Sequence, residues 1–268
     1  MIDSHTHSNH SPDSSSRAED MIKEAIRLNV KYYAITDHCD YDFDYCTNTN
    51  FSLPALDIDN HIKTINLLKN KYRSVIDIAC GIEVGYSRES ESAYKKLIDT
   101  YPLDVIINSV HTVYNEDCYQ KNYFENKTQH EAYEYYFKCV LNSIYASYDY
   151  DIIGHLGYVI RKAPYKKRLF DFIEYKNILS DILKAIIEKG KTLEVNTHIH
   201  INETPILPSL ELLEQYKKMG GKKITFSSDA HYPTRICEKY EDTILALKNI
   251  GFDYLTYYKN REEFKYKI

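Results

Sequence analysis

The sequence contains no tryptophan, only 8 glycines in 268 residues, and no apolar run near the roughly 20 residues that a transmembrane helix requires. Its first residues, Met-Ile-Asp-Ser-His, lack both the basic and the apolar segment of a signal peptide. Six cysteines are scattered without a C-x-x-C pair, which predicts free thiols rather than a disulfide framework. These absences predict a soluble, cytoplasmic protein with no membrane partner. Its length suits a single domain over residues 1–268.

Charge of one sign does not dominate either. The chain has 34 Lys and Arg against 39 Asp and Glu, a formal net charge of −5. A dedicated nucleic-acid binder shows a basic stripe, and no such stripe is present here. Nucleic acid is therefore not the expected partner, although a nuclease is not excluded. The sequence leaves the oligomeric state open.

Short apolar runs alternate with longer amphipathic stretches along the whole chain. The runs predict strands at Met1–Ser4, Lys31–Thr36, Val75–Val84, Asp104–Val110, Asp151–Gly154, Thr192–Asn196, Lys223–Ser227 and Asp253–Tyr257. The amphipathic stretches predict helices at Ala18–Leu28, Ile58–Tyr72, Glu89–Thr100, Gln129–Tyr145, Phe172–Lys189, Ser209–Met219 and Tyr240–Ile250. Strands separated by helices pair in parallel, so the pattern predicts an α/β fold. Seven or eight such units approach a (β/α) barrel, and the Gly-rich turn typical of the competing open sheet is missing.

Imidazole and carboxylate groups follow these predicted strands, at the point where each strand ends. The strand ends of a parallel barrel meet on one face, so these side chains are expected to share one cavity. His5 and His7 alternate in an extended segment and therefore point to the same side. The full set contains three carboxylates and six imidazoles: His5, His7, Asp13, His38, Glu83, His111, His155, Asp229 and His231.

Such a cluster is poorly solvated and self-repelling unless cations bind it. Nine ligands exceed the four of one tetrahedral site, so the sequence predicts two or three divalent ions. The mixed nitrogen and oxygen donors suit zinc, iron or manganese. Three other histidines are interpreted differently: His10 as a solvated loop residue, and His61 and His130 as core or surface residues of helices.

The same residues resemble the motifs of the polymerase and histidinol phosphatase (PHP) superfamily. The resemblance runs from residue 3 to residue 231 and rests on His5-Thr6-His7, Thr36-Asp37-His38, Gly81-Ile82-Glu83, Ser109-Val110-His111, Gly154-His155 and Ser228-Asp229-Ala230-His231. The length and the segment from Glu194 to Thr197, followed by Glu203, look like the histidinol-phosphatase branch. This resemblance implies a distorted, TIM-like (β/α)7 barrel with a trinuclear metal site.

The resemblance also implies how the ligands divide among the ions. One ion would be held by His5, His7, Glu83 and Asp229, and a second by Glu83, His111 and His155, with Glu83 bridging. A third would be held by Asp13, His38 and His231. Asp37, beside His38, is interpreted as a residue that orients an imidazole.

The implied reaction is hydrolysis of a small-molecule phosphate monoester, most directly L-histidinol phosphate in histidine biosynthesis, by a metal-bridging hydroxide. Asp229 or His231 is the predicted proton donor to the leaving group, and Arg161 is the predicted phosphate clamp. Arg17 and Arg88 are weaker candidates for that clamp. Glu203 and the aromatic, acidic run Tyr41–Tyr45 are candidates to contact the rest of the substrate, and a solvated surface loop is the equal alternative for that run.

The chain departs from the branch after Asn196 and Thr197. The branch commonly has a small residue, a glycine and a basic residue there, whereas this sequence has His198-Ile199-His200. His198 and His200 alternate in the same way as His5 and His7. We therefore interpret one of them, His200, as a substrate-facing residue, with ligand and plain loop positions as the alternatives.

Three other functions compete with this prediction. A PHP phosphoesterase acting on nucleotides or nucleic-acid ends would need an open groove lined with lysine. An amidohydrolase-type barrel also begins with His-x-His, but it commonly uses a lysine where this chain has His111. A non-catalytic, metal-bound module that serves a partner is disfavoured because all nine ligand positions are filled.

Overall fold

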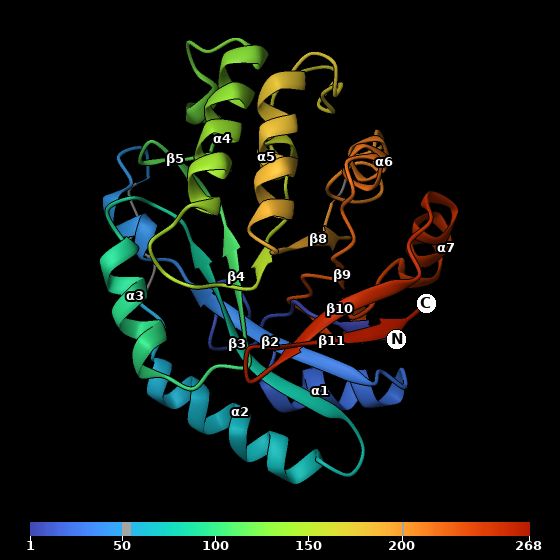
Figure 1. Ribbon diagram of the computed structural model, residues 1–268. Coiled ribbons are helices and arrows are strands. Elements are labelled where there is room, and N and C mark those ends of the chain that lie inside the picture. The colour runs from blue at the N-terminus through green and yellow to red at the C-terminus, as the bar shows by residue number, and fades with distance from the viewer. Residues whose placement is uncertain (50–54, 200) are drawn as a thin grey trace.

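The computed structural model describes residues 1–49, 55–199 and 201–268. Seven strands form one sheet in the order β1-β2-β3-β4-β7-β8-β9, and every neighbouring pair is parallel (Figure 1). Their bounds are β1 (Ile2–Asp3), β2 (Tyr32–Cys39), β3 (Asp77–Gly85), β4 (Val105–Ser109), β7 (Ile152–Ile153), β8 (Thr192–Asn196) and β9 (Ile224–Ser227).

The sheet closes on itself where β1 meets β9. The amide of Ser4 donates to the carbonyl of Phe226 at 3.0 Å, and the amide of Asp229 donates to the carbonyl of His5 at 2.8 Å. A parallel bridge between Thr6 and Ala230 continues this contact. The result is a nearly closed barrel of seven parallel strands, which confirms the predicted α/β barrel.

Helices connect the strands and surround the barrel (Figure 1). Their bounds are α1 (Ala18–Arg27), α2 (Ile58–Tyr72), α3 (Glu91–Thr100), α4 (Gln129–Ile144), α5 (Lys176–Glu188), α6 (Leu210–Lys218) and α7 (Tyr240–Ile250). Each overlaps a predicted helix. The largest difference is at α5, which begins four residues after the predicted start because residues 172–175 form turns. Within the described part of the chain, no helix is long and apolar enough to cross a membrane.

The last predicted strand, Asp253–Tyr257, does not join the barrel. The structure instead has β10 (Tyr254–Lys259) paired antiparallel with β11 (Glu262–Lys267), a strand that the sequence analysis missed. An antiparallel pair needs only a short turn, and Asn260 and Arg261 both adopt a positive φ there. Of the seven or eight units that the pattern allowed, the barrel therefore has seven, as the resemblance implied.

The hairpin of β10 and β11 covers the amino-terminal end of the barrel. The ammonium of Lys259 lies 2.7 Å from the carboxylate of Asp77, at the start of β3. Nε of Arg261 lies 2.6 Å from Oδ2 of Asp151, just before β7. The hairpin thus covers one end of the barrel, opposite the end at which the strands deliver their last residues.

Two long loops leave that opposite end. The first follows β2 and contains the 3₁₀ helix η1 (Tyr41–Tyr45), and residues 50–54 of it lie outside the described residues. The second follows β4 and contains a small pair of strands, β5 (Thr112–Val113) and β6 (Glu116–Asp117), and then η2 (Lys121–Phe124). Both loops contribute to the walls of a cavity.

Candidate active site

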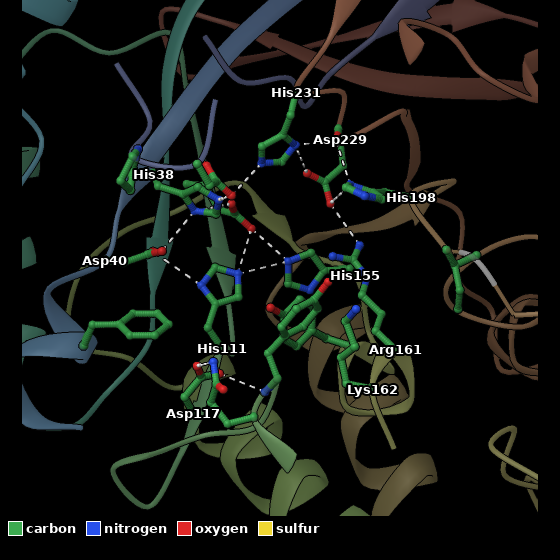
Figure 2. Close-up of a pocket in the computed structure, with 18 of the residues that line it drawn as sticks. His38, Asp40, His111, Asp117, His155, Arg161, Lys162, His198, Asp229 and His231 are labelled. Carbon is green, nitrogen blue, oxygen red and sulfur yellow. Dashed lines mark hydrogen bonds and ion pairs between the residues drawn. The ribbon is translucent and has the colours of Figure 1, made fainter. Parts of the chain in front are cut away.

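A cavity of about 700 Å³ opens at the carboxyl-terminal end of the strands (Figure 2). Metal-type ligands form its floor, and aromatic and charged side chains from the loops form its walls. The described residues that line it are Pro12, Asp13, His38, Asp40, Phe43, Glu83, His111, Asp117, Tyr119, Gln120, His155, Tyr158, Arg161, Lys162, Arg168, His198, Ile199, Asp229, His231 and Tyr232.

Glu83 lies at the centre of the floor and turns its two carboxylate oxygens toward different imidazoles. Its Oε2 lies 3.2 Å from Nε2 of His5 and 3.0 Å from Nδ1 of His38. Its Oε1 lies 2.9 Å from Nε2 of His155 and 3.3 Å from Nε2 of His111. The strand register explains part of this, because His38 and Glu83 are directly paired between β2 and β3.

Asp229 brings a second carboxylate to the pair of histidines that begins the chain. Its Oδ1 lies 3.2 Å from Nε2 of His7 and 3.9 Å from Nε2 of His5. Because Oε2 of Glu83 lies within 3.6 Å of both rings, these four side chains surround one point. They are the four that the resemblance assigns to a first ion.

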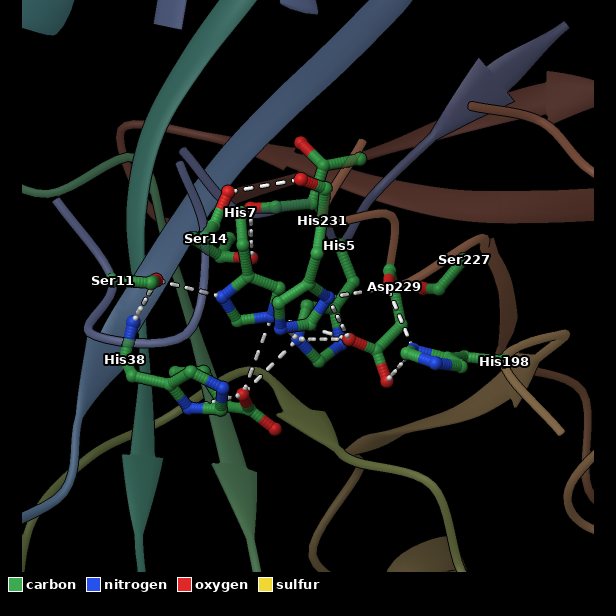
Figure 3. Close-up of polar contacts among 12 residues, drawn as sticks. His5, His7, Ser11, Ser14, His38, His198, Ser227, Asp229 and His231 are labelled. Carbon is green, nitrogen blue, oxygen red and sulfur yellow. Dashed lines mark hydrogen bonds and ion pairs between the residues drawn. The ribbon is translucent and has the colours of Figure 1, made fainter. Parts of the chain in front are cut away.

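Asp13 contributes the third carboxylate from the mouth of the cavity, where its side chain is 52% exposed. Its Oδ2 lies 2.9 Å from Nε2 of His231 and 3.6 Å from Nε2 of His38. The rings of His38 and His231 both stack on His7, with centroids 4.2 Å apart (Figure 3). All nine predicted ligands therefore lie around one cavity, and their contacts overlap, because His38 approaches both Asp13 and Glu83.

The donor atoms of this cluster fit divalent metal ions. Within the described part of the chain, buried polar atoms without a hydrogen-bond partner include Oε2 of Glu83 and the Nδ1 atoms of His38, His111 and His155. Several of these atoms lie close to other predicted ligand atoms, but the geometry of the contact is not that of a hydrogen bond. Crowded imidazoles and carboxylates of this kind are the ligand types that zinc, iron and manganese bind.

The pKa values of two histidines in the cluster also affect metal binding. Burial, with the nearby rings of His231 and His38, lowers the pKa of His7 to about 4, so this ring keeps its lone pair at neutral pH. Burial also opposes the charged form of His5, but Glu83 and Glu194 outweigh burial and raise the pKa of His5 well above its usual value. A proton must therefore leave His5 when a cation binds, which couples metal binding to pH.

Several residues behind the ligands hold the rings in place. Oε1 of Glu194 lies 2.6 Å from Nδ1 of His5. Asp37, predicted to orient an imidazole, accepts a hydrogen bond from the hydroxyl of Ser11 at 2.8 Å, and this hydroxyl lies 2.9 Å from Nδ1 of His7. The position of Asp37 therefore suits the predicted role, exerted through Ser11.

Arg161, the predicted phosphate clamp, lines the cavity beside Asp229. Its Nη2 donates to Oδ2 of Asp229 at 2.9 Å and to Oδ1 of Asn196 at 3.2 Å. Its guanidinium lies over the ring of Tyr158, 4.8 Å from the ring centre. The turn that carries both residues, η3 (Tyr158–Arg161), is held by the buried hydroxyl of Tyr136, which accepts the amide hydrogen of Tyr158 at 3.1 Å.

Comparison with known proteins agrees with this geometry. The model of the PHP domain family matches residues 3–198, most of the chain. This chain belongs to the PHP domain family. The histidinol-phosphatase of Lactococcus lactis is 31% identical over 94% of this chain and 91% of its own length. The histidinol-phosphatase of Bacillus subtilis is 28% identical over 82% of this chain and 88% of its own.

Solved structures of PHP relatives agree with the fold. The crystal structure of the Lactococcus lactis histidinol phosphate phosphatase, complexed with zinc, L-histidinol and phosphate, has a TM-score of 0.87, with 30% identity and 98% of both chains covered. A protein of Listeria monocytogenes shares the fold at 19% identity, with a TM-score of 0.77 over 90% of this chain and 99% of that one. The predicted PHP resemblance is therefore confirmed.

Some predicted contacts lie away from the PHP cavity. Glu203 is exposed, accepts a hydrogen bond from the amide of Arg168, and is absent from the described residues of the cavity wall. His200 lies outside the described residues. Arg17 and Arg88 are exposed, as surface charges would be. The substrate-binding roles of Glu203 and His200 remain predictions.

Three histidines were predicted to be neither metal ligands nor substrate contacts, and the structure describes all three. His61 is buried, but it has partners: its Nδ1 lies 3.1 Å from Oδ2 of Asp37, and its Nε2 lies 2.9 Å from the carbonyl of Gly81. It is a core histidine, as interpreted. His130 is an exposed residue of α4. His10 is half-buried, and its ring lies edge-on to that of His61.

The sequence analysis missed Asp40, a cavity carboxylate. Its Oδ2 lies 3.0 Å from Nδ1 of His38, and its Oδ1 lies 3.4 Å from Nδ1 of His111 (Figure 2). A signal was available, because Asp40 follows His38 by two residues at the end of a strand, the spacing that pairs His5 with His7. The sequence analysis also gave no role to Asn196, which contacts Asp229.

Proposed function

We propose that this protein is a metal-dependent phosphomonoesterase that hydrolyses L-histidinol phosphate to L-histidinol and phosphate. The observation that carries the proposal is the gathering of three carboxylates and six imidazoles on the floor of one cavity, with Glu83 facing two groups of rings. The similarity to histidinol-phosphatases over nearly the whole chain supports the choice of substrate. Two or three zinc, iron or manganese ions are proposed to bind there.

When bound, such ions supply an activated hydroxide and neutralise charge on the phosphate oxygens. The proposed ligands are His5, His7, Glu83 and Asp229 for one ion, Glu83, His111 and His155 for another, and Asp13, His38 and His231 for a third. Arg161 adds a fixed cation beside Asp229, on the wall of the same cavity. Its guanidinium is proposed to hold the phosphate in line for attack, because a planar fork of donors matches two phosphate oxygens.

The leaving alkoxide needs a proton. Both donors predicted from the sequence are already engaged: Asp229 is paired with Arg161, and His231 contacts Asp13 through Nε2 and the carbonyl of Asp229 through Nδ1. Asp40, a further cavity carboxyl, does not suit this role: burial opposes its charged form, but the rings of His38 and His111 outweigh burial and lower its pKa to about 2. We therefore propose that Asp40 holds the rings of His38 and His111 in place, and the proton donor stays one of the two residues predicted from the sequence.

The remaining wall suits a substrate with a cationic, planar end. Asp117 adds an acidic group from the loop after β4, and Tyr119 and Phe43 add aromatic rings. Phe43 belongs to the run that the sequence analysis named as a candidate to contact substrate. Lys162 is the single lysine among the described lining residues. A lysine-lined groove for nucleic-acid ends is therefore not what this part of the chain forms.

Steady-state kinetics of the zinc- or manganese-loaded protein test the proposal. We expect kcat/KM for L-histidinol phosphate to exceed kcat/KM for p-nitrophenyl phosphate and for a nucleoside monophosphate. Arg161→Met is expected to raise KM for phosphate esters, and Arg17→Met, which alters an exposed arginine away from the cavity, is the matched control. Comparable efficiencies on all three substrates would contradict the assignment of histidinol phosphate. The cytoplasmic location stays a prediction.

A further inference from the structure

Two imidazoles converge on the backbone carbonyl of Asp229. Nδ1 of His198 lies 2.9 Å from this oxygen, and Nδ1 of His231 lies 3.0 Å from it (Figure 3). Asp229 has a φ of 50°, in the left-handed region that residues with a side chain rarely adopt. Such a conformation persists when the surroundings hold it, and here two rings do so.

The carboxylate of Asp229 faces two ways because of this turn. Its Oδ1 lies toward His7, at 3.2 Å. Its Oδ2 receives hydrogen bonds from Arg161 at 2.9 Å and Asn196 at 3.2 Å. Nδ1 of His198 also lies 3.5 Å from Oδ2, so this one ring contacts both the backbone and the side chain of the proposed ligand.

The contact between His198 and the backbone carbonyl of Asp229 determines which ring nitrogen of His198 carries a proton. A carbonyl oxygen only accepts hydrogen bonds, so Nδ1 of His198 must carry the proton. The backbone around the ring is anchored as well. The amide of His198 donates to Oδ1 of Asn196 at 2.8 Å, and the next carbonyl, that of Ile199, accepts from Lys239 at 3.2 Å.

We propose that His198 is a positioning residue for the metal ligand Asp229. It holds the left-handed turn so that Oδ1 faces His5 and His7 while Oδ2 faces Arg161. The inference rests on the metal centre of the proposed function, but not on the identity of the substrate. It assigns a use to the His198-Ile199-His200 segment, where this chain departs from the pattern of its branch.

Two amide substitutions separate this role from a general loss of packing. His198→Asn places an amide nitrogen near the position of Nδ1, whereas His198→Gln places its amide nitrogen near Nε2. Zinc affinity of each full-length variant is measured by competition with a chromophoric chelator, without substrate. We expect the weakest zinc site of His198→Gln to bind zinc roughly 10- to 100-fold less tightly than the same site of the wild type. This is the usual effect of removing a residue that holds a metal ligand. The zinc affinity of His198→Asn is expected to remain close to that of the wild type.

The exposed His130, replaced in His130→Gln, is the matched control and is expected to leave zinc affinity unchanged. Equal zinc affinity in His198→Gln and the wild type, or equal losses in the Asn and Gln variants, would overturn the proposal. A rise in KM alone would also overturn it, since that result assigns His198 to substrate rather than to Asp229. If the wild type fails to hydrolyse histidinol phosphate while the Asn and Gln variants still differ in zinc affinity, the proposed substrate fails and the positioning role stands.

Discussion

Glu194 holds the ring of His5 in one orientation: its Oε1 lies 2.6 Å from Nδ1 of the imidazole. Because the carboxylate accepts the proton on Nδ1, Nε2 is the nitrogen that faces the cavity floor, toward Glu83 and Asp229, and it is the one that gives up its proton when a cation binds. Both side chains are fully buried. Glu194 does not line the cavity, and its other oxygen accepts hydrogen bonds from the backbone amide of His155 and from Nδ2 of Asn196.

Glu194→Gln is therefore expected to weaken metal binding without removing a ligand. The amide is a poorer acceptor, and a rotated amide would turn its NH₂ group toward Nδ1 of His5. We expect zinc affinity to fall roughly 10- to 100-fold. Chelator competition measures it, with Glu203→Gln on the exposed loop as the control. An unchanged affinity in Glu194→Gln would show that His5 is held without this hydrogen bond.

Asp40→Asn tests whether Asp40 holds metal ligands or donates a proton, by comparing leaving groups. An alkyl phosphate such as histidinol phosphate releases a basic alkoxide, whereas p-nitrophenyl phosphate releases a stable phenolate. Because Asp40 lies 3.0 Å from His38 and is ionised, we expect its loss to weaken zinc binding roughly 10- to 100-fold and to lower kcat for both esters by a similar factor. Zinc content is measured in parallel by chelator competition. A loss confined to histidinol phosphate, with zinc affinity unchanged, would make Asp40 the proton donor instead.

The buried pair of His61 and Asp37 makes stability depend on pH. Burial alone would lower the pKa of His61, but the carboxylate of Asp37, 3.1 Å from Nδ1, outweighs burial and raises this pKa to about 10. The folded state therefore binds this proton more tightly than the unfolded state, in which the pKa is about 6.5. The stabilisation is fully present below pH 6.5 and is lost as pH rises through 10.

His61→Gln should therefore lower the free energy of unfolding most at low pH. We expect the difference in free energy of unfolding between wild type and His61→Gln to shrink between pH 6.5 and 9, by at most about 1.4 kcal/mol per pH unit. Urea unfolding of metal-free protein at several pH values measures it, and the exposed His130→Gln serves as the control. A difference that stays constant with pH would mean that His61 is neutral in the folded protein.

Much of the site could be predicted because parallel strands deliver their last residues to one place. His38, Glu83 and His155 are far apart in the chain, yet each directly follows an apolar run, so the strand pattern alone predicts that they meet. The resemblance then supplied the grouping around individual ions. Which oxygen of Glu83 faces which ring depends on side-chain packing, and no pattern in the sequence encodes it.

The differences at the last strands have physical causes of the same kind. The strand β11 contains four charged residues in six and covers the barrel end with only part of its surface, so it shows little apolar periodicity. Its partner β10 was recognised as a strand, but direction of pairing is set by a turn at Asn260 and Arg261 that lacks glycine.

Arg261, in the turn between β10 and β11, forms an ion pair across the covered end of the barrel. Nε of Arg261 lies 2.6 Å from Oδ2 of Asp151, a carboxylate whose side chain is only 7% exposed and which also accepts the amide hydrogen of Ile106. Arg261→Met removes the cation but leaves the acid. Because the arginine is partly exposed, we expect a loss of about 2 kcal/mol in the free energy of unfolding, below the range for a fully buried pair.

The pair lies at the barrel end opposite the cavity, so kcat/KM of Arg261→Met should match the wild type at temperatures where both are folded. Adding Asp151→Asn to Arg261→Met should recover part of the lost stability, since the double variant no longer buries an unpaired charge. Lys184→Met, which breaks an exposed contact with Glu188 at 3.8 Å, is the control and should change stability little. Lost activity in a stably folded Arg261→Met protein would mean instead that the hairpin influences the metal centre through the length of the barrel.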